Sequence, residues 1–235
     1  MDARLSFPLW FGDAAYRKAF IVCCRATSST LGSPQHRRVE EAARKVGIRV
    51  SLGVSERDGD DLFMGIGVIN PNGETLVVRC KSKPSGREWD VFASGPGNDV
   101  TVAQTPAGNV GTLRSNENLR PLMRAELYQQ DIQIQFSSWP HFGLFSGRRA
   151  VSYVLAAGAS VAIERVAKCV IIAATQIASQ AYIDELQLPP GADGAVAAGS
   201  GPSRIFEPVM GEVIGGLADP TFDGLIYADI GRGAV

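Results

Sequence analysis

The sequence predicts an α/β protein with mixed sheets, because three features of the chain point to that class. Segments with the apolar spacing of helices alternate with short apolar runs suited to strands. Two strand-turn-strand patterns, at residues 62–79 and 204–214, add antiparallel hairpins to this alternation. The chain has 235 residues, of which 45% are hydrophobic and 20% charged, so one sizeable core can form. We therefore expect a single domain over residues 1–235.

The first predicted helix covers residues 33–47. Ser33 suits its N-cap, Pro34 its first turn and Gly47 its C-terminal end, and apolar residues at positions 39, 42, 43 and 46 share one face. A strand is expected next, at Ile48–Val54.

A hairpin follows, with strands at Leu62–Ile69 and Thr75–Arg79. The turn between them reads Asn70-Pro71-Asn72-Gly73, and these residues tolerate backbone angles that strands do not. The elements expected further along are strand 110–113, helix 119–130, strand 132–136, helix 150–168, strand 169–174, loop 187–202, and hairpin strands 204–206 and 212–214 leading into 224–229.

Ser115 falls on a predicted elbow between a strand and a helix. Val110–Leu113 is a short apolar run, and Pro121 suits the first turn of the helix that follows. Backbone N–H groups at such an elbow can hold a developing negative charge. On chain geometry alone, a serine at this position is more often a turn or capping residue than a nucleophile.

Charge and hydropathy argue against a nucleic-acid or membrane partner. The formal net charge is −1, whereas phosphate binding needs a clustered positive surface. The local basic cluster at residues 36–38 is balanced by Glu40 and Glu41, so this part of the helix is expected to be a solvated face. The longest apolar stretch, residues 151–174, contains Glu164, Arg165 and Lys168, which makes it too charged for a spanning helix.

The N-terminus and the cysteines indicate a cytoplasmic protein without a metal site. Residues 1–20 lack the basic start and continuous apolar core of a signal peptide. The cysteines at positions 23, 24, 80 and 169 lack the paired spacing of a zinc site and are expected to be reduced thiols.

Residues 108–142 resemble the nucleophile segment of nitrilases, in the aliphatic nitrilase and cyanide hydratase-like branch of the carbon-nitrogen hydrolases. That segment typically reads Gly-x-Leu-x-Cys-Trp-Glu, followed by Pro-Leu, Leu-Tyr and Trp-Pro-x-Phe. The matching residues are Gly111, Leu113, Glu117, Pro121, Leu122, Leu127, Tyr128, Trp139, Pro140 and Phe142. Ser115 stands where the family has its reactive cysteine, and Asn116 where it has tryptophan.

The resemblance implies catalytic positions elsewhere in the chain. Nitrilases use a cysteine, a glutamate base and a lysine to convert a nitrile and water to a carboxylic acid and ammonia, without a cofactor. The run from Arg79 to Ser85 is similar to the family's Arg-x-Lys-x-Lys-Pro-Thr motif, so it implies Lys81 as the catalytic lysine and Glu88 as an auxiliary glutamate, with Trp89 in place of an arginine. The implied substrate-binding residues are Asn116, Glu117, Trp139, Pro140 and His141.

The same resemblance sharpens the fold to a four-layer α-β-β-α sandwich that lacks the first strand-helix unit. Residues 5–20 resemble the segment after the family's Pro-Glu motif, and no glutamate precedes Glu40. The domain is therefore expected to be N-terminally incomplete and to lack the glutamate base. Ser115 paired with Lys81 is one source of a substitute base, since a desolvated lysine can accept a proton.

Two functions remain open. The first is a nitrilase-type hydrolase acting on a small-molecule nitrile, impaired by the loss of the thiol and of the base, because serine needs a strong neighbouring base. The alternative is a catalytically inactive nitrilase-like protein, a pseudoenzyme, that acts through self-association or co-assembly. The resemblance implies a homo-oligomer in either case.

Overall fold

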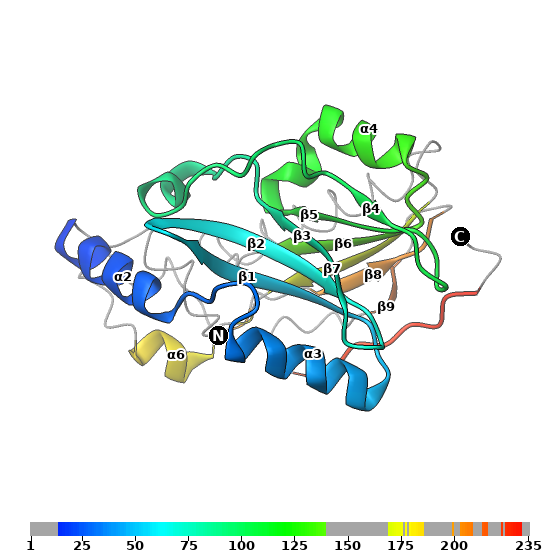
Figure 1. Ribbon diagram of the computed structural model, residues 1–235, viewed down its shortest axis with the longest axis horizontal. Helices are drawn as coiled ribbons and strands as arrows, with labels where there is room; N and C mark the ends of the chain where they lie inside the picture. Colours follow the sequence, from blue (N-terminus) through cyan, green and yellow to red (C-terminus); the bar gives the residue numbers. More distant parts are fainter. Residues whose placement is uncertain are drawn as a thin grey trace.

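The computed structural model describes residues 14–139, 169–175, 177, 179–185, 199, 203–208, 213–215, 222 and 224–231. Within them, two β-sheets lie face to face with helices on their outer sides (Figure 1). The first sheet has the order β1-β2-β3, with β1 at Val50–Asp58, β2 at Asp61–Ile69 and β3 at Thr75–Cys80. The second has the order β4 to β9, with strands at Val102–Ala103, Val110–Arg114, Ile134–Trp139, Val170–Thr175, Arg204–Phe206 and Val213–Gly215.

The first sheet is an antiparallel meander. β1 pairs with β2 from Val50 opposite Ile69 to Asp58 opposite Asp61, and Gly59 in the connecting turn has φ 57. A positive φ is favourable for glycine, so the turn can be this tight. Along β2, Leu62, Ile66 and Val68 alternate onto the buried face.

The second sheet places three parallel strands at its centre. β5 pairs with β6 and β6 with β7 in parallel, while β4, β8 and β9 are antiparallel neighbours. The carboxyl ends of β5, β6 and β7 therefore meet at one edge of the sheet, which is where ligands bind in open α/β sheets.

Helices cover the outer faces of the sheets. The helices are α2 at Ala14–Thr27, α3 at Pro34–Val46, α4 at Pro121–Gln129 and α6 at Gln180–Glu185, with short 3₁₀ helices η2 at Gly86–Asp90 and η3 at Ser115–Leu119. α4 packs on the second sheet, where Leu127, Leu113 and Ile132 share one core. A Cβ atom added to Gly111 of β5 would lie 2.7 Å from Ile132 Cδ1, so a glycine here permits the close approach.

The predicted fold class is confirmed, and several elements match. Ser33 accepts a hydrogen bond from the backbone N–H of His36, and Gly47 ends α3 with φ 71. The hairpin of β2 and β3 and the strands β5, β7 and β8 also lie where the sequence predicts them. All four cysteines lie in the described residues, and none of them forms a disulfide.

Other boundaries were wrong. The strand predicted at 48–54 is β1 at Val50–Asp58, because its pairing with β2 continues to the turn. The helix predicted at 119–130 begins at Pro121, since Arg120 is extended and a residue before proline disfavours helical angles. The strand predicted at 132–136 is β6 at Ile134–Trp139.

The predicted solvated face of α3 was wrong for two of its residues. His36 Nε2 lies 3.3 Å from Thr75 Oγ1, and Glu40 Oε1 accepts a hydrogen bond of 2.6 Å from the same hydroxyl. These side chains are half-buried because the β2–β3 hairpin packs against α3, whereas Arg37 and Arg38 are exposed.

The absent first strand-helix unit, helix 150–168 and loop 187–202 are expectations that lie outside the described residues, except that Gly199 forms an isolated bridge. Within the described ranges, no helix is both long and apolar enough to cross a membrane.

Candidate active site

Lys81 and Glu88 form a buried ion pair just beyond β3. Lys81 is 1% exposed, and its Nζ donates a hydrogen bond of 2.6 Å to Glu88 Oε2. Glu88 lies in η2 and also accepts from the backbone N–H of Ser85. Burial lowers the pKa of Lys81, and the charge of Glu88 offsets part of this effect. The ammonium can therefore release its proton more readily than an exposed lysine.

Ser115 is the first residue after β5 and adopts a strained backbone conformation. Its φ is 46, in the left-handed region that residues with a Cβ rarely occupy. Asn118 Nδ2 donates a hydrogen bond of 2.9 Å to the carbonyl of Ser115, and Gln135 Nε2 in turn donates to Asn118 Oδ1 at 2.7 Å. The turn that projects Ser115 is thus held by buried side chains.

Glu117 connects this turn to the lysine segment. Its two carboxylate oxygens accept hydrogen bonds from Arg79 Nη1 at 2.7 Å and Arg79 Nη2 at 3.0 Å. They also accept from the backbone N–H groups of Ser82 and Arg114, each at 2.9 Å. Glu117 is 0% exposed and Arg79 is 1% exposed, so the whole contact set is buried. We call these four hydrogen bonds the Glu117 brace.

The brace fixes two segments that are far apart in the sequence. Arg79 and Ser82 flank Lys81, and Arg114 immediately precedes Ser115. Burial alone would raise the pKa of Glu117, but the hydrogen bonds and charge of Arg79 outweigh it and lower that pKa. Glu117 is therefore a stable anion, and it holds the end of β3 against the end of β5.

Arg114 reaches from the second sheet to the first. Its Nη1 donates hydrogen bonds to the carbonyl of Gly65 and, at 3.3 Å, to the carbonyl of Val54. Burial lowers the pKa of Arg114. The side chain consequently spans the space between the two sheets.

A family model for carbon-nitrogen hydrolases matches residues 16–235. The chain belongs to the carbon-nitrogen hydrolase family. It is 33% identical over 228 residues to the arylacetone-specific nitrilase of Alcaligenes faecalis, covering 95% of this chain but 63% of that protein. It is 33% identical over 231 residues to a nitrilase of Pseudomonas syringae pv. syringae, covering 97% of this chain and 68% of the relative. The chain thus spans 63% and 68% of the lengths of these two relatives.

Solved structures share the carbon-nitrogen hydrolase fold. A cysteine-to-serine mutant of the Nesterenkonia AN1 amidase from the nitrilase superfamily matches with a TM-score of 0.68 and 18% identity, over 91% of this chain and 74% of the amidase. A carbon-nitrogen hydrolase from Helicobacter pylori G27 matches with a TM-score of 0.68 and 15% identity, over 83% and 66% of the two chains.

The other predicted site residues occupy different environments. Asn116 is exposed beside Ser115, and Trp139 is the last residue of β6 and is 5% exposed. Glu117 directs its carboxylate into the brace, so its predicted contact with substrate stays a prediction. Pro140 and His141 lie outside the described residues.

Three residues that the sequence did not single out contribute to the site. Arg79 supplies a buried cation and Arg114 a half-buried one, and Asp99 accepts a hydrogen bond of 2.8 Å from the backbone N–H of Cys80. Arg79 opens the motif that carries Lys81, and Arg114 is a charged residue at the end of an apolar strand. The positions of these two arginines could have indicated a role in the site. Nothing in the sequence around Asp99 indicates its hydrogen bond with the backbone of Cys80.

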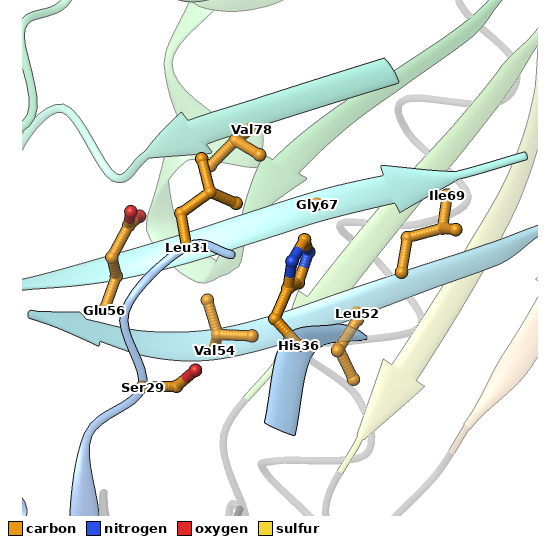
Figure 2. Close-up of a pocket in the computed structure, with 9 residues that line it drawn as sticks. All are labelled: Ser29, Leu31, His36, Leu52, Val54, Glu56, Gly67, Ile69 and Val78. Carbon is orange, nitrogen blue, oxygen red and sulfur yellow. The ribbon is translucent and has the colours of Figure 1, made fainter. Parts of the chain in front are cut away.

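A separate pocket lies on the outer face of the first sheet. Figure 2 shows it lined by Ser29, Leu31, His36, Leu52, Val54, Glu56, Gly67, Ile69 and Val78. Val78 points away from Arg79, since successive strand residues face opposite sides, so this pocket is not part of the Lys81 site. Within the described residues, no group of three histidine, cysteine or acidic side chains could hold a metal ion.

Proposed function

We propose that this chain hydrolyses a small organic nitrile to a carboxylic acid and ammonia at a site built on Ser115, Lys81 and Glu88. The observation that carries the proposal is the Glu117 brace, which holds the lysine segment against the strand end from which Ser115 projects. The similarity to two proteins named nitrilases supports the reaction class.

Each side chain has a role suited to its contacts. Ser115 Oγ is the nucleophile, and the Lys81 ammonium gives its proton to the nitrile nitrogen, where negative charge develops. Both hydrogen bonds to Glu88 end on Oε2, so Oε1 can accept the serine proton. Proton transfer within the Glu88–Lys81 pair then restores both groups.

The proposed reaction consumes two water molecules. Addition of the Ser115 hydroxyl across the carbon-nitrogen triple bond gives an enzyme-bound imidate ester. The first water adds to the imidate carbon, and ammonia leaves with formation of an acyl ester on Ser115. The second water hydrolyses that ester, which releases the carboxylic acid and the free hydroxyl.

The serine limits the rate of this chemistry. A hydroxyl is a weaker nucleophile than a thiol, because a thiol ionises far more readily near neutral pH and its sulfur is intrinsically more nucleophilic. We therefore propose that the native chain is slow, and that Ser115→Cys hydrolyses nitriles faster than the native chain.

Ammonia release from a panel of aliphatic and aryl nitriles tests the proposal. We expect release by the native chain, faster release by Ser115→Cys, and none by Ser115→Ala or Lys81→Met. Arg38→Gln, at an exposed position on α3, is the control and should match the native chain. Turnover that survives both Ser115→Ala and Lys81→Met would refute the assignment.

A second candidate function is association without catalysis. Exposed apolar side chains on the described surface favour it, since Leu122 is 86%, Tyr227 76% and Leu225 74% exposed. In this case the chain would act in the cytoplasm as a homo-oligomer or in co-assembly with an intact relative. Light scattering after size exclusion would then show an oligomer. Neither the native chain nor Ser115→Cys would release ammonia from any nitrile of the panel. A monomer would refute self-association.

A further inference from the structure

The carboxyl ends of β5, β6 and β7 carry polar side chains that the proposed nitrile chemistry does not use. Arg114, Ser138 and Ala174 lie side by side, because Arg114 pairs with Ser138 and Ser138 with Ala174. Side chains at paired positions point to the same face of a sheet. Since Arg114 reaches carbonyls of the first sheet, this row faces the space between the sheets. Thr112 precedes Arg114 by two residues and shares that face.

Two hydroxyl groups in this cluster have no hydrogen-bond partner. Thr112 Oγ1 and Ser138 Oγ are both buried, and neither has a partner among the residues that the structure describes. Thr112 is 1% exposed as a residue. Buried polar atoms nearly always have a partner, because leaving one unpaired is costly. The two hydroxyls therefore indicate a polar ligand in the space that they face.

Arg114 indicates that this ligand is an anion. Arg79 pairs with Glu117, and Lys81 pairs with Glu88. No ion pair joins Arg114 to a carboxylate in the described part of the chain, where Glu88 and Glu117 act on it only from longer range. Asp99 also lies 3.8 Å from Arg79 Nε, so the three carboxylates of the site face Arg79 and Lys81 and none of them forms an ion pair with Arg114. Its guanidinium donates hydrogen bonds to two carbonyls, and Arg114 as a whole is half-buried.

We infer that the site takes a nitrile that also bears a carboxylate, which binds the guanidinium of Arg114 and the hydroxyl of Ser138. A carboxylate matches both the planar donor set of arginine and the free hydroxyl. Ala174 has a small, exposed side chain and leaves room at the end of the row. For the tests we take a short carbon chain between the carboxylate and the nitrile carbon, since Arg114 and Ser115 are adjacent in the sequence. The inference rests on the proposed function for the nitrile half of the substrate.

Binding tests the carboxylate half without turnover. Titration calorimetry at low salt would compare glutarate with glutaramide, which has the same size and no charge. A hydrogen bond to a charged group contributes about 1.5–3 kcal/mol, so we expect glutarate to bind about 10- to 150-fold more tightly. Arg114→Gln should abolish this preference, Arg114→Lys should keep part of it, and Ser138→Ala should weaken glutarate several-fold. The control Arg38→Gln should behave as the native chain.

Equal affinity of the native chain for glutarate and glutaramide would overturn the inference. So would an unchanged preference in Arg114→Gln, provided that its circular dichroism spectrum is native. If Arg114→Gln does not fold, two measurements still test the inference: the affinities of the native chain for glutarate and glutaramide, and the affinity of Ser138→Ala for glutarate.

Turnover separates this inference from the proposed function. We expect kcat/KM for 4-cyanobutanoate to exceed that for hexanenitrile at least about tenfold. Equal kcat/KM values would overturn carboxylate recognition while supporting hydrolysis. Selective glutarate binding without ammonia from either nitrile would refute hydrolysis while supporting the carboxylate site.

Discussion

Replacing Glu117 by glutamine tests whether the brace holds the site together. The substitution keeps the shape of the side chain but removes the charge that faces Arg79, which is 1% exposed. Arg79 could still donate to the amide oxygen of the glutamine and to Ser82 Oγ at 3.3 Å, but its one remaining carboxylate neighbour would be the more distant Asp99, whose Oδ1 lies 3.8 Å from Nε. Breaking a buried ion pair from one side costs about 3–5 kcal/mol. For a chain of this size, we expect a fall in Tm of roughly 6–20 °C.

Urea unfolding followed by circular dichroism would measure this loss, with Glu41→Gln on the exposed part of α3 as the matched control. Arg79→Met combined with Glu117→Leu removes both charges and should cost less than Glu117→Gln alone, because no unpaired buried charge remains. Ammonia release by Glu117→Gln should also fall, since the strand ends are no longer held together.

The pH dependence of stability gives an independent test of the same charge. The folded pKa of Glu117 is lowered from its ordinary value of 4.5, so its contribution is fully present above that value. The contribution is lost as the pH falls through the lower, folded pKa. We expect the difference in unfolding free energy between the native chain and Glu117→Gln to shrink in that acidic range. A difference below about 1 kcal/mol at neutral pH would refute the reasoning.

Three further predictions concern neighbouring residues. Lys81→Met leaves Glu88 buried without its cation, and urea unfolding should show a loss of about 3–5 kcal/mol, together with loss of ammonia release; unchanged stability would contradict the ion pair. Burial, followed by the charges of Glu56 and Asp99, raises the pKa of Cys80 to about 12. At pH 8, mass spectrometry should therefore show slower alkylation of Cys80 by iodoacetamide than of the exposed Cys23, with equal labelling only after unfolding. Ser115→Gly should be more stable than Ser115→Ala by about 1 kcal/mol of unfolding free energy, because glycine adopts a φ of 46 without strain. The glycine variant should therefore have the higher Tm, and equal Tm values would show that the turn is not strained.

Local patterns predicted much of the fold because short segments determine them. The cap, proline and glycine of α3 and the turn of the β2–β3 hairpin act within a few residues. The longer extent of β1 depends on pairing with β2, and the contact of His36 with Thr75 joins residues far apart in the sequence. The spacing of residues within one segment cannot predict the β1–β2 pairing or the contact of His36 with Thr75.

The candidate site shows the same division. The motif around Lys81 and the segment around Ser115 resemble nitrilases. That resemblance predicts which positions of the sequence form the site. The hydrogen bonds of Glu117 to Arg79 and Ser82 were not predictable, because they depend on how the ends of β3 and β5 meet. The reach of Arg114 to carbonyls of β1 and β2 likewise requires the distance between the two sheets.

Glu117 explains why stability and chemistry are coupled in this fold. The two sheets meet where β3 and β5 end, and a reaction there needs a nucleophile and a cation held at a fixed separation. A buried ion pair seldom adds much stability beyond what apolar packing would give, but removing one member is costly. The brace therefore constrains geometry more than it stabilises the chain. In the proposed reaction, the brace holds the end of β5, and with it Ser115, against the segment that carries Lys81.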